Sequence, residues 1–527
     1  MKVKRYCQPL LCALLVLPSI GVLASQSSGA AESSLSSSAA GYNSNGVMNF
    51  AFDLSVPIEF DPLKETLDDT GNFIGQLVND SLFRAQPNGS LTPELATAAS
   101  IVDPETISIK LRSGVVFQDG TPLNAAAVKF TILRNSASTS VAFPAPIHDV
   151  SSIDLNGNLG LTIHLSQPEA GAFFPLLADM STMPLSPAAV ARNNPNPVTN
   201  PLGAGPFRVQ QYAADQSLIL AKNKTYWNAK NIKLGGIDFV NESSSTPASI
   251  DALKSGQVDA ISSNITQLGA LKGGDIKTSL AASTTSKLYF PLCDTKGPLT
   301  NVRVRQALSY ALNRKAINQA LVGGKGQLAW GLVPSSSNLF PSDLSNYYAY
   351  NPAKAKKLLA QAGYAKGLTL TMAPGVSTDL QQLALIAQQE WKQIGVNLEL
   401  SNSPAATYVQ DVFVNHLYNL TDADVVRNGL DAISSLFTPG HLGDLCGYDN
   451  PTLDAMVTQM GGLAPNNPQY IQLWKKAQDF IVKNALAVWA VWLPTVVAYN
   501  STRVGGIETV FPGVTAYPDF FTAYVKK

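Results

Sequence analysis

The strongest constraint on the fold is a strand–helix–strand pattern between residues 368 and 400. Leu368 to Met372 alternates as a strand does, and Asp379 to Ile394 has apolar residues at helical spacing. After Gly395, Val396 to Leu400 again has the pattern of a strand. Two strands joined by a crossover helix predict a βαβ unit with parallel strands. The class is therefore α/β, with mixed sheets.

Three further patterns predict local structure. Residues 150–165 form two alternating stretches around Asn156-Gly157, which predicts a β-hairpin. Residues 301–321 have apolar side chains at helical spacing up to Gly323-Gly324, which predicts one helix. A second helix should begin at Pro352, with Asn351 as its N-cap.

Length and charge narrow the class of protein. A chain of 527 residues is long enough for about three domains. Lys plus Arg and Asp plus Glu are 37 each, so the chain lacks the basic excess of a nucleic-acid binder. Hydrophobic residues make up 45%, which excludes a wholly disordered chain.

The N-terminus predicts export. Met1 to Arg5 is basic and Leu10 to Leu17 is apolar, so residues 1–24 have the pattern of a signal peptide cleaved near Ala24. Residues 25–46 are rich in Ser and Ala and predict a flexible leader. The apolar stretch from 485 to 499 is short and contains Pro494, so we expect a soluble, periplasmic mature protein.

Two cysteines remain after cleavage, Cys293 and Cys446. In an oxidising compartment such a pair predicts one disulfide bond, and the alternative is two buried free thiols.

Catalytic and metal-binding motifs are missing from the sequence. It contains no HExxH, GxSxG, GxxxxGK[ST] or GxGxxG pattern, and its four histidines share no ligand spacing. We therefore expect no enzyme, no cofactor and no metal site. The loop residue Trp330, between Ala329 and Gly331, is a candidate for ligand contact or for packing within its own domain.

A series of phrases along the chain resembles the extracytoplasmic solute-binding proteins of ABC importers, in the family that binds peptides, nickel complexes and opines. These phrases are Phe60-Asp-Pro62, Gly89 to Ala96, Leu111 to Ala125, Asn200 to Phe207, Asn223 to Trp227, Ser255 to Asp259, Val302 to Arg314, Ala355 to Gly363 and Gly447 to Asp454.

The resemblance implies two lobes joined by a hinge that close on a ligand. The first lobe would comprise residues 47–89, 200–292 and 496–527, with residues 90–199 as an inserted subdomain. Residues 293–495 would form the second lobe. The implied partners are a small-molecule or peptide ligand and a membrane permease, and we expect a monomer.

The resemblance also indicates where a ligand would bind. Peptide-binding members hold the ligand's amine with an Asp and its carboxylate with an Arg; the matching positions here are Asn428 and Ser377, which carry no charge. Gly375 removes a side chain from the wall and would enlarge the pocket. Arg427 could hold an anionic group or lie on the surface. Thr70 and Asp431 are polar neighbours of loops that we expect to face the cleft.

The leading functional prediction is a periplasmic binding component that captures a peptide or peptide-like solute for an ABC importer. The alternatives on the same scaffold are a binder of a non-peptide organic solute or a nickel chelate, and a ligand-sensing partner of a membrane receptor. An exported hydrolase is disfavoured by the missing motifs.

Overall fold

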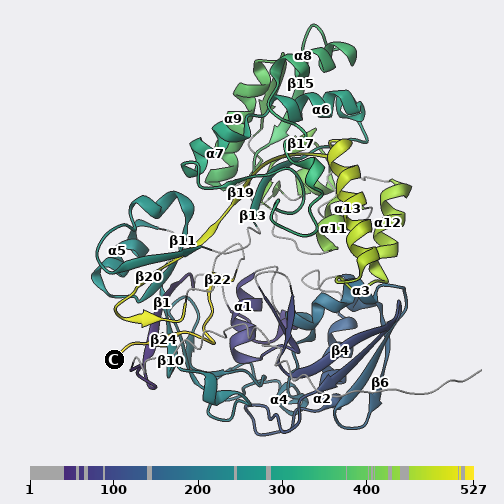
Figure 1. Cartoon of the computed structure of the whole chain (residues 1–527). Coiled ribbons are helices and arrows are strands. Elements are labelled where there is room, and N and C mark those ends of the chain that lie inside the picture. Colours follow the sequence, from purple (N-terminus) through teal and green to yellow (C-terminus); the bar gives the residue numbers. More distant parts are fainter. Residues whose placement is uncertain are drawn as a thin grey trace, which may run out of the picture. The chain divides into compact units, whose positions relative to one another are not determined.

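The computed structural model (Figure 1) describes most of the chain from Gly41 onward. The described residues are 41–54, 58–64, 69–86, 90–138, 145–242, 246–280, 286–375, 377–401, 403–404, 407–408, 410–424, 430–438, 450–507, 510–511 and 517–527. The predicted signal peptide, and the leader up to Ala40, lie outside these ranges.

A seven-stranded mixed sheet is built from both ends of the chain. Its order is β12-β20-β11-β1-β10-β9-β8. The strands are β1 (Val47–Phe52), β8 (Phe207–Ala213), β9 (Ser217–Lys222), β10 (Gly236–Asn241), β11 (Ala260–Asn264), β12 (Ile276–Leu280) and β20 (Thr495–Asn500). β1 is parallel to β10 and β11, and the other pairs are antiparallel. Helix α5 (Pro247–Ser255) lies between β10 and β11 in the chain.

The beginning and the end of the described chain are joined. The amide of Asn43 donates to the carbonyl of Val525 at 2.8 Å, and Tyr42 bridges to Lys526. Residues 41–46 are therefore held by the C-terminus, so the part of the predicted leader from 41 to 46 is not flexible. The short strands nearby are β21 (Val504–Gly505) with β24 (Tyr524–Val525), and β22 (Val510–Phe511) with β23 (Tyr517–Pro518).

The predicted insertion contains its own antiparallel sheet, ordered β4-β5-β7-β6. Its strands are β4 (Ala96–Asp103), β5 (Thr106–Leu111), β6 (Val150–Asn156) and β7 (Gly160–Leu165). The hairpin predicted around Asn156-Gly157 is confirmed, because β6 and β7 pair from Asn156 opposite Gly160. The other elements here and before it are α1 (Asp69–Val78), α2 (Ala125–Ser136), α3 (Ala170–Phe173), α4 (Pro187–Ala191), β2 (Phe83–Ala85) and β3 (Leu91–Pro93).

The βαβ prediction is confirmed in the second half of the chain. β15 (Leu368–Ala373) and β16 (Val396–Leu400) are parallel and are joined by α9 (Thr378–Lys392). β17 (Leu420–Thr421) extends this sheet on the other side of β15. A neighbouring sheet has the order β14-β19-β13-β18, with β14 (Gln327–Leu328), β19 (Ala487–Leu493), β13 (Ser286–Pro291) and β18 (Ala423–Asp424). Figure 1 shows α9 beside α7 (Arg314–Val322).

The single helix predicted over residues 301–321 is wrong, since the structure has two. α6 (Val302–Ala311) ends where Leu312 becomes extended, and α7 (Arg314–Val322) begins after it. The Asn313 side chain caps α7 by accepting from the amide of Ala316. The Asn313 amide donates to Oε2 of Glu390 at 2.6 Å, so it has no need of a helical carbonyl partner.

Asn351 begins its helix as predicted. Its side chain accepts from the amide of Lys354 and caps α8 (Pro352–Gln361). The remaining helices are α11 (Asp431–Phe437), α12 (Pro451–Gly461) and α13 (Pro468–Lys483). None of the helices in the described ranges is both long and apolar enough to cross a membrane.

The chain passes twice between the seven-stranded sheet and the β13–β19 sheet. One passage follows β12 and leads to β13, and the other is Pro494, between β19 and β20. Because β13 pairs with β19 from Ser286 to Pro291, the second sheet begins before residue 293. The lobe boundary at residue 293 lies just after β13 and stays a prediction.

Candidate ligand-binding site

The carboxyl ends of β15 and β17 bring together two of the predicted site residues. Gly375 follows β15, and Ser377 is the N-cap of α9. β17 is the parallel neighbour of β15, and Asp422 follows it directly. The amide of Gly375 donates to Oδ1 of Asp422 at 2.6 Å. Because ligands of open α/β sheets bind outside the carboxyl ends of strands, this corner is a candidate wall of a binding site.

The structure corrects the role predicted for Gly375. A Cβ atom at this position would lie 2.4 Å from Cδ1 of Leu380 and 3.3 Å from Oδ1 of Asp422. The space is therefore occupied by packed protein atoms and adds no volume to a pocket. Gly375 instead permits the close approach of α9 to the end of β15.

Ser377 is exposed at this corner. Its Oγ accepts from the amide of Leu380 at 3.4 Å, which uses the side chain as the cap of α9. Next to it, burial raises the pKa of Asp379 above its usual range. The described part of the corner therefore offers neutral hydrogen-bonding groups and a half-buried carboxyl.

A hydrogen-bonded chain supports this corner from behind. The hydroxyl of Thr421 donates to the carbonyl of Ala373 at 2.6 Å. The hydroxyl of Tyr408 lies 2.7 Å from the hydroxyl of Thr421. Thr421 and Asp422 are both buried. Thr421 and Asp422 were not predicted from the sequence. A polar pair directly after the apolar Leu420 is the signal that could have identified them.

Trp330 lies elsewhere, in a second cluster. It is half-buried, and the guanidinium carbon of Arg314 lies 4.7 Å from the centroid of its ring. Trp330 packs against an apolar cluster that also contains Leu430 and Ile433, at the start of α11. Asp431 is the first residue of α11. Trp330 and the start of α11 thus belong to one apolar cluster, and their joint role in a binding site stays a prediction.

A buried lysine next to the strand passages was not predicted. Lys287 in β13 pairs with Trp492 in β19 and is fully buried. Its Nζ lies 5.3 Å from the ring centroid of Trp492 and 5.8 Å from that of Tyr289. Since all three side chains are buried, they stabilise the sheet where the chain passes towards β12 and β20.

The other predicted site residues are only partly placed. Thr70 lies in the first turn of α1, and its side chain is outside the description. Arg427, Asn428 and Cys446 lie outside the described residues. The Sγ of Cys293 is buried and lies 3.9 Å from the hydroxyl of Thr295. Within the described ranges, no three His, Cys, Asp or Glu side chains gather as metal ligands.

A cavity of about 140 Å³ lies away from all of these residues. It is lined by segments around η1 (Pro62–Lys64), α2 and the loop from 193 to 203, and Asp61 and Arg134 form an ion pair at its wall. No predicted site residue lines this cavity.

The chain matches the family model of "Bacterial extracellular solute-binding proteins, family 5 Middle" over residues 90–443. The chain belongs to this family. The glutathione-binding protein GsiB of Escherichia coli K12 is 28% identical over 465 residues, which is 82% of this chain and 86% of GsiB.

Two solved structures share the fold of this chain. The ABC transporter substrate-binding protein CtaP from Listeria monocytogenes superposes with a TM-score of 0.78 at 23% identity, over 92% of this chain and all of CtaP. A peptide-binding protein AppA from Clostridium difficile, described as putative, gives a TM-score of 0.77 at 20% identity. The superposition covers 91% of this chain and all of that AppA chain. The family 5 chain therefore has the two-lobed periplasmic-binding-protein fold.

Proposed function

We propose that this family 5 protein is the periplasmic binding component of an ABC importer, which captures a peptide or peptide-like solute between its lobes and delivers it to a membrane permease. The observation that carries the proposal is the family match across residues 90–443. The relative GsiB, which is named for glutathione, supports a peptide-like ligand. The protein would act as a monomer without cofactor or catalysis.

The two passages between the sheets support the proposed lobe arrangement. The first lobe would comprise residues 47–89, 200–292 and 496–527, together with the insertion 90–199. The second lobe would comprise residues 293–495. The passages after β12 and at Pro494 would serve as the hinge. Closure would exclude water and strengthen the polar contacts to the ligand. The proposed ligand-binding set remains Thr70, Trp330, Gly375, Ser377, Arg427, Asn428 and Asp431. In this set Gly375 allows the close packing of Leu380.

Export and oxidation belong to the same proposal. Residues 1–24 would be cleaved as the signal peptide, and Cys293 and Cys446 would form a disulfide in the periplasm.

A second candidate is a non-peptide organic solute with little charge. The observation that favours it is the exposed, neutral Ser377 capping α9, at the position where peptide-binding relatives are expected to carry an arginine. A serine hydroxyl can hydrogen-bond a carboxylate but cannot neutralise it.

Isothermal titration calorimetry of the mature protein tests the proposal. Glutathione, trialanine and a dipeptide are the peptide probes, and an opine, a glycoside and a nickel–histidine complex are the others. We expect one class to bind with a Kd of about 10 µM or tighter, roughly −7 kcal/mol or more. The peptide proposal is contradicted if only the non-peptide probes bind, and the binding role itself if none binds while an ester or peptide substrate is turned over.

A further inference from the structure

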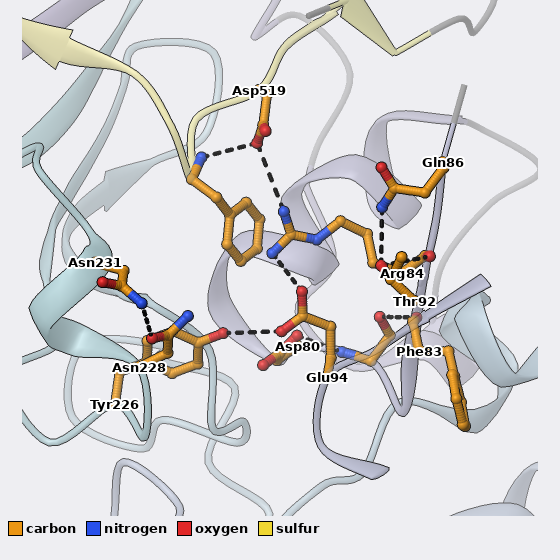
Figure 2. Close-up of polar contacts among 12 residues, drawn as sticks. Asp80, Phe83, Arg84, Gln86, Thr92, Glu94, Tyr226, Asn228, Asn231 and Asp519 are labelled. Carbon is orange, nitrogen blue, oxygen red and sulfur yellow. Dashed lines mark hydrogen bonds and ion pairs between the residues drawn. The ribbon is translucent and has the colours of Figure 1, made fainter. Parts of the chain in front are cut away.

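A buried group of charged side chains joins segments that are far apart in the sequence (Figure 2). This Arg84 cluster consists of Asp80, Arg84, Glu94, Tyr226 and Asp519. Arg84 Nη2 lies 2.6 Å from Oε1 of Glu94, and its Nη1 lies 3.7 Å from Oδ1 of Asp519. The hydroxyl of Tyr226 donates to Oε2 of Glu94 at 3.5 Å. The cluster thus ties the end of α1, β2 and the segment after β9 to the C-terminus.

The charges of the cluster do not balance when all groups are ionised. Arg84 pairs with Glu94 and Asp519, and its charge also acts on Asp80. A second cation, Arg112, packs over Trp227 and donates from Nε to the main-chain oxygen of Glu94 at 2.9 Å. Three negative charges against two positive charges leave one in excess. A buried excess charge is costly, and one bound proton removes it.

Asp80 is the carboxyl best placed to hold this proton. It follows the C-terminal end of α1 with φ of 64°, and its amide donates to the carbonyl of Gly75. The residue therefore lies at the negative end of the helix dipole, where a carboxylate is disfavoured. Oδ1 accepts from the amide of Ser81 at 2.8 Å, whereas Oδ2 has no hydrogen-bond partner in the described structure. Burial, together with the charge of Glu94, raises the pKa of Asp80 to about 7, and burial also raises the pKa of Glu94.

The same arginine holds the C-terminal segment, residues 517–527. The guanidinium carbon of Arg84 lies 3.3 Å from the ring centroid of Phe521, in addition to its contact with Asp519. Tyr517 stacks on Phe73 of α1 with ring centroids 3.7 Å apart. The segment therefore depends on α1 at one point and on Arg84 at another.

We propose that the Arg84 cluster makes the attachment of residues 517–527 to α1 and β2 dependent on proton binding. With Asp80 protonated, Arg84 is shared between Glu94 and Asp519. When Asp80 ionises, it repels Glu94 and attracts the guanidinium, which weakens the longer contact to Asp519 and the stacking on Phe521. Because the pKa of Asp80 is raised in the folded state, the stability that this carboxyl contributes is fully present below about pH 4 and is lost as the pH rises through about 7.

Hydrogen–deuterium exchange of the full mature protein tests this coupling at pH 6 and pH 8, after correction for intrinsic exchange rates. We expect the amides of residues 517–527 to exchange about tenfold faster at pH 8, relative to a central strand such as β10. Asp80→Asn keeps the shape and tolerates a positive φ but cannot ionise, so it should abolish the difference. A wild-type segment with equal protection at both pH values, or an Asp80→Asn protein that keeps the difference, overturns the proposal.

Glu169→Gln is the matched control. Burial and the nearby Asp149 also raise the pKa of Glu169, but it lies at the start of α3, outside the Arg84 cluster. This variant should keep the wild-type change in the C-terminal segment. Loss of the change in Glu169→Gln would assign the pH dependence to another group and would also overturn the proposal.

Discussion

The amide of Gly375 and the carboxylate of Asp422 meet at 2.6 Å and join the ends of two parallel strands, β15 and β17. This bond fixes the turn that leads into α9, whose cap is Ser377. The candidate ligand wall thus depends on a buried carboxylate that has no need to touch the ligand.

Removal of this carboxylate should destabilise the second half of the chain. Asp422→Ala leaves a buried amide without its acceptor, and we expect the free energy of unfolding to fall by about 1–3 kcal/mol in urea titrations. Asp422→Asn retains an acceptor oxygen and should lose less. Equal urea midpoints for wild type and Asp422→Ala would show that the bond contributes nothing.

An added methyl group at Gly375 should also be costly. Gly375→Ala places its Cβ against Cδ1 of Leu380, so overpacking should cost about 1–3 kcal/mol of unfolding free energy. Leu380→Ala alone creates a cavity, and in the double variant each change should relieve part of the other's effect. Additive losses in a double-mutant cycle by thermal or urea unfolding would mean that the two side chains do not compete for space.

Acid should weaken the contact between the loop that follows β5 and helix α4, both within the insertion. Burial alone would raise the pKa of Asp119, but hydrogen bonds from Thr121 and Ser186 and the charge of Arg192 hold it below its usual range. The stability that this depressed pKa contributes is present above about pH 4 and is lost as the pH falls further.

The measurement is the melting temperature between pH 5 and pH 3. The Asp119→Asn variant should melt at a lower temperature than wild type at pH 5. Its melting temperature should fall less than that of wild type between pH 5 and pH 3. Asp154→Asn, which removes an exposed carboxyl, should keep the wild-type slope. A steep fall in Asp119→Asn would assign the acid sensitivity to other carboxyls.

Trp330 should contribute to stability as well as to any ligand contact. Arg314 is buried and bonded to main-chain oxygens, and Trp330 covers its guanidinium. Trp330→Ala should therefore cost about 2 kcal/mol, and Trp330→Phe should recover most of this loss. If Trp330→Phe folds normally and also keeps full affinity for the probe that binds wild type, its role is packing alone.

The disulfide is open to direct measurement. A loop of about 150 residues closed by Cys293 and Cys446 would contribute up to about 5 kcal/mol in the chain-entropy model. Peptide mapping by mass spectrometry without reduction should find the two cysteine peptides linked, and reduction should lower the melting temperature. Alkylation of both thiols without prior reduction would exclude the bond.

Local patterns predicted most of the fold, and tertiary contacts account for what they missed. The βαβ unit and the 150–165 hairpin follow from periodicity and turn residues, which are local properties. The break at Asn313 does not, because its amide is satisfied by Glu390, 77 residues away. The contact of residues 41–46 with the C-terminus could not be predicted either, because it also joins residues that are far apart in the sequence.

The candidate site was predictable only where a family phrase indicated it. Gly375 and Ser377 were found through the resemblance, and the structure places both at one strand end. Asp422 was not predicted, since its bond to Gly375 joins residues that lie 47 apart in the sequence. The volume assigned to Gly375 could not be judged from sequence, because Leu380 fills it from the following helix.

The central claim is that the protein captures a solute, and native mass spectrometry of the protein purified from periplasm without refolding tests it most directly. We predict a bound adduct that is released on denaturation. Masses that differ by amino-acid residues would identify a sequence-tolerant peptide binder, and one discrete mass would identify a dedicated solute. An adduct-free protein that also remains unliganded after incubation with peptide and metabolite extracts would contradict the claim.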